Sequence, residues 1–177
     1  MAERGEAIVL IGFMGSGKSS VGRELAARTR LPRYDTDEMV ASRYGLSIAE
    51  IFGQHGEEAF RAAETEALAQ VPDRPTIVVT GGGIVLRSEN VQRLHQLGVI
   101  VHLTANEETL FERVSRRKTR PLLETEDPRK TLSEMLRLRE PHYQHAADFT
   151  VDTSELRHEE VADRILEQIP ELHLHAS

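Results

Sequence analysis

Gly12-Phe13-Met14-Gly15-Ser16-Gly17-Lys18-Ser19 matches the pattern G-x-x-x-x-G-K-[ST] of a phosphate-binding loop. The apolar run 7–11 before it is typical of a buried strand, and residues 20–28 after it have a helical pattern. Strand, glycine-rich loop and helix in this order are the context that the motif requires. The glycines let backbone N–H groups curl around phosphate oxygens, and the helix N-terminus adds a positive dipole. The stretch therefore predicts an α/β fold that binds a nucleotide phosphate.

Two side chains of the loop extend this prediction from phosphate to metal. Lys18 can reach the β- and γ-phosphates of a nucleotide, and the Ser19 hydroxyl can ligate Mg²⁺. The competing interpretation is a glycine-rich turn that carries a lysine by chance. The strand and helix that flank the loop make that interpretation the weaker one.

Composition restricts the class of protein. The length of 177 residues predicts one domain, and 39% hydrophobic residues fit a soluble globular protein. The absence of cysteine excludes disulfides and thiolate sites, and it agrees with the cytoplasm. The polar N-terminus predicts neither a signal peptide nor a membrane span. A net charge of −7 argues against binding to nucleic acid or to an anionic membrane. We therefore expect a cytoplasmic protein with small-molecule ligands.

Apolar runs alternate with helical patterns along the chain. The predicted strands are residues 7–11, 31–35, 76–79, 99–103 and 149–151. The predicted helices are residues 20–28, 89–97, 107–114, 128–145 and 156–169, and the segments 40–52 and 57–70 are expected to form two or three helices. Pro141 is expected to break the 128–145 helix, because proline lacks the N–H that an interior helical residue donates. The alternation predicts a parallel sheet with helices on both faces.

Three polar features follow predicted strands, and ligands of open parallel sheets bind beyond these strand ends. They are the phosphate loop, Asp35-Thr36-Asp37 and Gly81-Gly82-Gly83, and we expect them to converge. One carboxylate can face the metal while the other takes a proton from an acceptor hydroxyl. Capping of the next helix by Thr36 or Asp37 is the alternative. The glycines fit either a close backbone approach to a small ligand or a tight turn.

Arginines supply further candidate contacts to anions. Arg61 and Glu64 lie three residues apart on a predicted helix, so Glu64 can hold Arg61 toward a substrate carboxylate. An exposed surface pair is the alternative. Residues 118–124 interrupt the helical pattern, and they fit a mobile flap that brings Arg120 over the phosphates or a plain surface loop. Arg139 is a candidate second anion contact.

Taken together, these residues resemble the shikimate kinase family. The family's motifs appear in order: the phosphate loop, Asp35-Thr36-Asp37, Phe60-Arg61 with Glu64, Gly81-Gly82-Gly83, residues 119–123, and Arg139 with Pro141 and Tyr143. The match extends from about Ile8 to Thr153. A phosphate loop alone occurs in many unrelated nucleotide-binding proteins, whereas the ordered set is specific.

The resemblance implies a fold and a reaction. The fold is a three-layer α/β/α phosphate-loop kinase fold with five parallel strands in the order 2-3-1-4-5. Residues 1–177 would form a single kinase domain, with a substrate-binding region at about 38–64 and a lid at about 113–127. The implied reaction is the ATP-dependent phosphorylation of the 3-hydroxyl of shikimate, in chorismate and aromatic amino acid biosynthesis. Shikimate, ATP and Mg²⁺ are the implied ligands, and a monomer is expected.

The resemblance also assigns roles to single residues. The implied catalytic residues are Asp37, Lys18 and Arg120, and the implied metal ligands are Ser19 and Asp35. The implied ATP-binding residues are Gly15, Ser16, Gly17, Lys18, Ser19, Ser20, Arg113, Arg120 and Arg157. The implied shikimate-binding residues are Asp37, Phe52, Phe60, Arg61, Gly81, Gly82, Gly83 and Arg139. In this assignment Arg61 and Arg139 grip the substrate carboxylate, and Arg113 packs on adenine.

Other functions share some of these features. A gluconate-type sugar-acid kinase also uses a phosphate loop and a strand-end carboxylate, but it gives no reason for Arg61 and Arg139 beside three glycines. A non-catalytic, kinase-like sensor domain would bind ATP or a small acid without turnover. Loss of Lys18, Asp37 or Arg120 would favour that alternative, and all three are present. A GTPase is disfavoured because the sequence has no Asn-Lys-x-Asp guanine motif.

Overall fold

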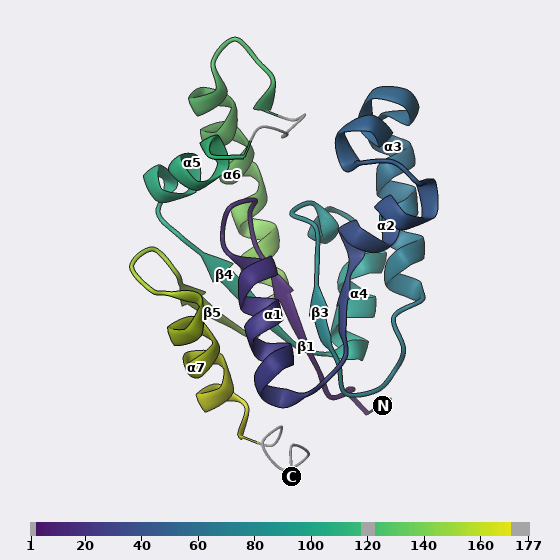
Figure 1. The fold of residues 1–177 in the computed structure, drawn as a ribbon, viewed down its shortest axis with the longest axis vertical. Coiled ribbons are helices and arrows are strands. Elements are labelled where there is room, and N and C mark those ends of the chain that lie inside the picture. The colour runs from purple at the N-terminus through teal and green to yellow at the C-terminus, as the bar shows by residue number, and fades with distance from the viewer. Residues whose placement is uncertain (1–2, 118–122, 171–177) are drawn as a thin grey trace.

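A computed structural model describes residues 3–117 and 123–170 of the chain. Its centre is a sheet of five parallel strands in the order β2-β3-β1-β4-β5 (Figure 1). The strands are β1 (Ala7–Ile11), β2 (Arg33–Asp35), β3 (Ile77–Val79), β4 (Gly98–Thr104) and β5 (Phe149–Asp152). The direction and order of the strands confirm the expected sheet.

Helices cover both faces of this sheet, as Figure 1 shows. In the described part of the chain they are α1 (Lys18–Thr29), α2 (Thr36–Tyr44), α3 (Ile48–Ala69), the 3₁₀ helix η1 (Ile84–Leu86), α4 (Ser88–Leu97), α5 (Glu107–Ser115), α6 (Pro128–Ala146) and α7 (His158–Gln168). Alternate residues of β1 point to opposite faces. Ile8 and Leu10 pack with apolar residues of α1 and α7, whereas Val9 and Ile11 pack with those of α4 and α6. The expected three layers are therefore present.

The strand register places the three polar features at one edge of the sheet. Val79, the last residue of β3, pairs with Leu10 of β1 on one side and with Asp35 of β2 on the other. The phosphate loop, the segment after Asp35 and the glycines after Thr80 therefore leave the sheet at the same level. This confirms the expected convergence, which follows from the parallel direction of the strands.

The segments 40–52 and 57–70, expected to form two or three helices, form α2 and α3, and the chain breaks within 40–52. α2 ends at Gly45, whose φ of 66° is left-handed and favours glycine. α3 then begins after Ser47, whose hydroxyl accepts from the Glu50 N–H while the Glu50 carboxylate accepts from the Ser47 N–H. This capping box fixes a new helix start. α2 and α3 form a hairpin with its own small core, which includes Val40 and Ile51.

The expected break at Pro141 is also wrong. α6 continues through Pro141 to Ala146, although proline removes one helical hydrogen bond. Tyr143 and Ala146 lie beyond the proline and are completely buried. Burial of that last turn against the sheet offsets the missing bond, so the helix is kept.

Among the helices within residues 3–117 and 123–170, none is long and apolar enough to cross a bilayer.

Candidate active site

The phosphate loop lies between β1 and α1 and is shaped by its glycines. Gly15 and Gly17 have φ values of 81° and 99°, which side chains with a Cβ rarely adopt. The Lys18 ammonium is nine-tenths buried and donates to the carbonyls of Gly12, at 2.6 Å, and Phe13, at 3.0 Å. The lysine is therefore placed by its own loop, over a separation of only a few residues.

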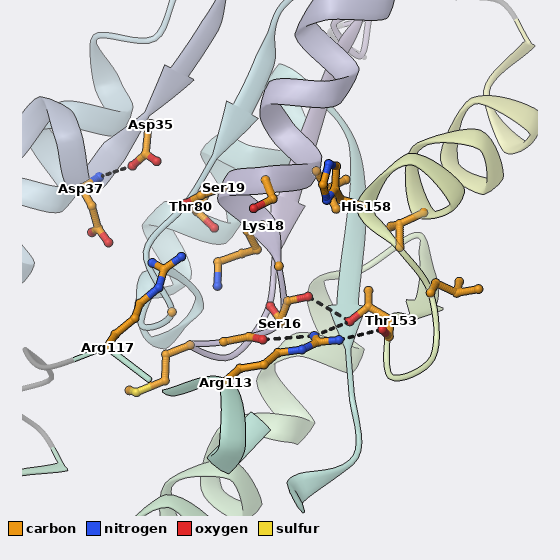
Figure 2. A pocket seen from close by; sticks show the side chains of 18 of the residues that line it. Ser16, Lys18, Ser19, Asp35, Asp37, Thr80, Arg113, Arg117, Thr153 and His158 are labelled. Carbon is orange, nitrogen blue, oxygen red and sulfur yellow. Dashed lines mark hydrogen bonds between the residues drawn. The ribbon is translucent and has the colours of Figure 1, made fainter. Parts of the chain in front are cut away.

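A cleft of about 700 Å³ opens beside this loop. It is lined by every residue expected to bind ATP except Arg120, which lies outside the described residues: Gly15, Ser16, Gly17, Lys18, Ser19, Ser20, Arg113 and Arg157. Asp35 and Asp37 line it from the second strand end. Figure 2 shows Lys18, Asp37 and Arg117 directed toward the middle of the cleft from different elements.

Arg113 of α5 holds the phosphate loop through hydrogen bonds. Its guanidinium donates to the Gly15 carbonyl at 3.2 Å and to the hydroxyl and carbonyl of Thr153 at 3.0 and 2.8 Å (Figure 2). The Thr153 hydroxyl donates in turn to the Ser16 carbonyl at 3.0 Å. Arg113 therefore joins the phosphate loop to the segment after β5, and its flat guanidinium forms part of the cleft wall.

Several residues that line this cleft had no predicted role, among them Thr153, Arg117 and His158. A signal for Thr153 was available, because it directly follows β5, and strand ends are where ligands of such sheets bind. His158 begins α7, which also places it at a helix N-terminus. No pattern in the sequence distinguishes Arg117 from its basic neighbours.

In the Asp35-Thr36-Asp37 segment, the side chains of Asp35 and Thr36 each hold a neighbouring part of the backbone. Asp35, not Thr36 or Asp37, caps α2: its Oδ1 accepts from the N–H groups of Asp37 and Glu38 at 3.0 and 3.2 Å. Burial raises the pKa of Asp35, and the two backbone donors oppose that shift. The Thr36 hydroxyl accepts from the Gly81 N–H at 3.1 Å and so holds the glycine segment.

A second cavity adjoins the cleft, and we call it the acceptor pocket. Its lining includes all the residues expected to bind shikimate, together with three others: Asp37, Phe52, Phe60, Arg61, Gly81, Gly82, Gly83 and Arg139, with Met14, Ile48 and Glu64. Asp37 and Gly82 line both cavities, so the two meet at these residues. The acceptor pocket combines carboxylates, guanidinium groups and one aromatic wall, where the rings of Phe52 and Phe60 lie 4.8 Å apart.

Arg61 and Glu64 form a buried pair, so the alternative of a surface pair is wrong. The Arg61 Nη1 lies 3.1 Å from Glu64 Oε2, and Glu64 has no exposed surface. Burial raises the pKa of Glu64 to about 7, although the positive charge of Arg61 opposes this. A second buried arginine, Arg139, reaches the same pocket from α6.

Gly81 and Gly83 pack closely against charged side chains, and they do so within the tight turn that leads from β3 to η1, where the Ile84 N–H donates to the Gly81 carbonyl at 3.2 Å. A Cβ on Gly83 would lie 2.3 Å from Arg61 Nη1. A Cβ on Gly81 would lie 2.5 Å from Glu64 Oε1 and 2.6 Å from Asp37 Oδ1. None of the three has a left-handed φ, so steric room rather than backbone conformation favours glycine at 81 and 83, whereas a Cβ on Gly82 would meet no atom closer than 3.4 Å. The charged side chains of the acceptor pocket thus lie directly on this backbone.

The donors near the loop fit magnesium. Ser19 and Asp35 both line the cleft and offer the hydroxyl and carboxylate oxygens that Mg²⁺ prefers. Within the described residues there is no cluster of three or more acidic, histidine or cysteine side chains. Mg²⁺ that is bound with nucleotide phosphates needs only one or two protein ligands and keeps several waters. Because Asp35 Oδ1 already caps α2, contact through water suits this carboxylate better.

This fold and this pair of cavities define a phosphate-loop kinase, with a nucleotide cleft beside a pocket for a small acid. The family model "Shikimate kinase" matches residues 14–170. A shikimate kinase of Thermodesulfovibrio yellowstonii is 43% identical over 166 residues, which cover 93% of this chain and 95% of the relative. One from Caldanaerobacter subterraneus is 43% identical over 90% and 93% of the two chains. The chain belongs to the shikimate kinase family.

Solved structures agree. A shikimate kinase from Acinetobacter baumannii, in complex with shikimate, has a TM-score of 0.89 and 33% identity, and the match covers 96% of this chain and 95% of that one. A gluconokinase from Sinorhizobium meliloti has a TM-score of 0.54 and 21% identity over 96% and 95% of the chains. That second likeness concerns the fold alone.

Proposed function

We propose that the chain is an enzyme that transfers the γ-phosphate of ATP to the 3-hydroxyl of shikimate and releases shikimate 3-phosphate and ADP. The observation that carries the proposal is the meeting of two cavities at Asp37, one beside a phosphate loop and one with two buried arginines. Relatives named shikimate kinase, which match this chain over most of their length, support shikimate as the substrate. The reaction belongs to chorismate and aromatic amino acid biosynthesis.

On the donor side, the backbone of residues 15–20 and the Lys18 ammonium hold the phosphates of ATP. Arg113 and Arg157 face the nucleoside, and Arg120 reaches the phosphates from the lid at about 113–127. Lys18 neutralises charge that develops on the transferred group. The lining of the cleft supports these roles for the described residues, and the role of Arg120 rests on the family resemblance.

On the acceptor side, Arg61 and Arg139 bind the shikimate carboxylate. Two planar guanidinium groups fix a carboxylate in orientation as well as position, which a lysine cannot do. Phe52 and Phe60 form the wall for the ring, and the glycine backbone approaches the hydroxyl groups. Asp37 accepts the proton of the attacking hydroxyl as the phosphoryl group arrives. The substrate-binding region at 38–64 supplies most of this pocket.

Ser19 and Asp35 would hold Mg²⁺, which neutralises phosphate charge when it is bound with ATP. We further propose that residues 1–177 form one kinase domain and act as a cytoplasmic monomer. The single sheet that carries both cavities supports one domain. Size-exclusion chromatography with light scattering tests the monomer, and a dimer would contradict it.

A coupled assay of ADP release tests the function, with ATP and Mg²⁺ present and shikimate compared with gluconate. We expect release that depends on shikimate and not on gluconate, because gluconate cannot place its carboxylate and its acceptor hydroxyl as the rigid shikimate ring does. Calorimetric titration with shikimate provides the second measurement. Binding without turnover in folded protein would contradict the proposal and favour a sensor domain.

A further inference from the structure

Tyr143 has a buried hydroxyl to which the proposed reaction gives no role. It lies four residues after Arg139 on α6, so the two side chains share a face of the helix. Tyr143 has no exposed surface and lines neither the cleft nor the acceptor pocket. Its hydroxyl donates to the carbonyl of Gly82 at 2.5 Å. A side chain behind the site therefore holds the backbone at the point where the two cavities meet.

This hydrogen bond sets the orientation of one peptide unit. In a trans peptide the C=O and the N–H point in opposite directions. Because the Gly82 carbonyl faces Tyr143, the N–H of Gly83 points away from Tyr143. No backbone acceptor within residues 3–117 and 123–170 takes the N–H of Gly82 or Gly83. The Tyr143 hydroxyl thus decides the direction of a donor beside Arg61.

The glycine segment has little stiffness of its own. Gly81 and Gly83 leave room for Arg61, Glu64 and Asp37, which pack against their backbone, but glycine also has the widest choice of φ and ψ. The conformation must be held from outside. Thr36 holds the N–H of Gly81, and Tyr143 holds the carbonyl of Gly82. Thr36 precedes the glycine segment in the chain and Tyr143 follows it, so the two bonds hold consecutive residues from two different parts of the chain.

The Tyr143 ring is itself fixed in place. It stacks on His102 of β4, with ring centroids 5.0 Å apart and an angle of 26° between the planes. Burial lowers the pKa of His102 and so favours the neutral imidazole. Burial raises the pKa of Tyr143, which keeps the phenol protonated and able to donate; the nearby Arg139 guanidinium opposes that shift.

We propose that Tyr143 is a positioning residue for shikimate: its hydroxyl fixes the Gly82–Gly83 peptide, and through it the backbone N–H donors at the acceptor pocket. Tyr143 acts through Gly82 and touches neither substrate. The proposal rests on the proposed function. It differs from a purely structural role because it predicts a defect confined to one of the two substrates.

Tyr143→Phe tests this, because it keeps the ring and the stack on His102 and removes only the hydroxyl. Steady-state kinetics with shikimate and ATP varied separately give the result. We expect the KM for shikimate to rise about tenfold, because a buried carbonyl is left without its donor and the peptide loses its fixed orientation. The KM for ATP should change by less than about twofold. Calorimetry with shikimate alone should show the same loss of affinity.

Two control variants separate positioning from stability. Tyr34→Phe removes a hydroxyl that accepts from Arg74, away from both cavities, and should leave both KM values unchanged. Ile165→Val trims a completely buried side chain of α7, and it should lower the melting temperature without raising the KM for shikimate.

The outcomes distinguish the two proposals. If wild-type protein does not phosphorylate shikimate, the proposed function fails and the kinetic test has no basis. If the wild type is active and Tyr143→Phe is folded with an unchanged KM for shikimate, the positioning role alone is overturned. Equal rises in both KM values, matched by Ile165→Val at equal loss of stability, would overturn it too.

Discussion

The phosphate loop and the acceptor pocket are built in different ways. The loop places Lys18 through carbonyls five and six residues away, Phe13 and Gly12. The acceptor pocket is held by contacts between distant segments: Thr36 to Gly81, 45 residues apart, and Tyr143 to Gly82, 61 residues apart. A short motif therefore positions Lys18, although Arg113 and Thr153 also hold the loop from 98 and 137 residues away. The acceptor half depends mainly on how distant segments of the chain pack. Substitutions in the acceptor half should therefore affect the use of shikimate without affecting ATP binding, and substitutions in the donor half should do the reverse.

The largest separation is expected from Asp37→Asn, which keeps the shape of the side chain but removes its basicity. We expect kcat to fall by roughly two to four orders of magnitude, because general-base catalysis contributes about that much. ATP affinity, measured by calorimetry, should change by less than about twofold. Activity near that of the wild type would contradict the role of Asp37 and would leave the acceptor half without a base.

Arg61→Ala should weaken the binding of shikimate and leave the binding of ATP nearly unchanged. The substitution removes one of two buried arginines and leaves Glu64 buried without its cation, so shikimate binding should weaken by about 2–5 kcal/mol. Arg113→Lys is the matched donor-side variant and should weaken ATP binding instead, because lysine cannot make the three contacts of Arg113. An unchanged KM for shikimate in Arg61→Ala would refute the assigned role.

Gly83→Ala tests whether close packing defines the acceptor half. Its Cβ would lie 2.3 to 2.6 Å from three atoms of the Arg61 guanidinium, which must then move. We expect the KM for shikimate to rise about tenfold or more, with little change in the KM for ATP. Gly53→Ala is the control, because a Cβ there meets no atom within 4 Å. That variant should be neutral or slightly more stable. Equal effects of the two variants would contradict the steric argument.

Glu64→Gln sharpens the comparison through pH. Burial raises the pKa of Glu64 from 4.5 to about 7 in the folded protein, so the folded state holds this proton more tightly than the unfolded state does. Its contribution to stability is therefore fullest below about pH 4.5 and falls as the pH rises to about 7. Denaturant unfolding from pH 4.5 to 8 should show a loss in the wild type that Glu64→Gln lacks. If the free energy of unfolding depends on pH in the same way in the wild type and in Glu64→Gln, the raised pKa of Glu64 is contradicted.

The smallest effect is expected from Ser47→Ala, which removes the cap of α3 but touches neither cavity. Loss of the capping box should lower the free energy of unfolding by about 1 kcal/mol. Because α3 carries Arg61, a rise in the KM for shikimate beyond about twofold would show that the acceptor half responds even to remote changes. Urea unfolding and kinetics below the melting temperature measure both quantities.

Much of this architecture could be predicted from local patterns. The strands, their order and the convergence of three strand-end features follow from alternation and from the family resemblance. Two or three helices were expected over 40–70, but the position of the boundary between α2 and α3 was not predicted, although Gly45 and the Ser47–Glu50 capping box are local signals. The continuation of α6 through Pro141 could not be predicted, because it depends on burial of Tyr143 and Ala146.

The position of Lys18 is encoded locally, because the phosphate loop sets it through glycines with left-handed φ and contacts across a few residues. The Asp35 cap of α2 is local as well, since its oxygen accepts from N–H groups two and three residues further on. Three other features depend on the folded chain. They are the burial of Glu64 with Arg61, the bond from Tyr143 to Gly82, and the contacts of Arg113 and Thr153 with the loop. Burial and contact between distant side chains arise only when the sheet brings its strand ends together.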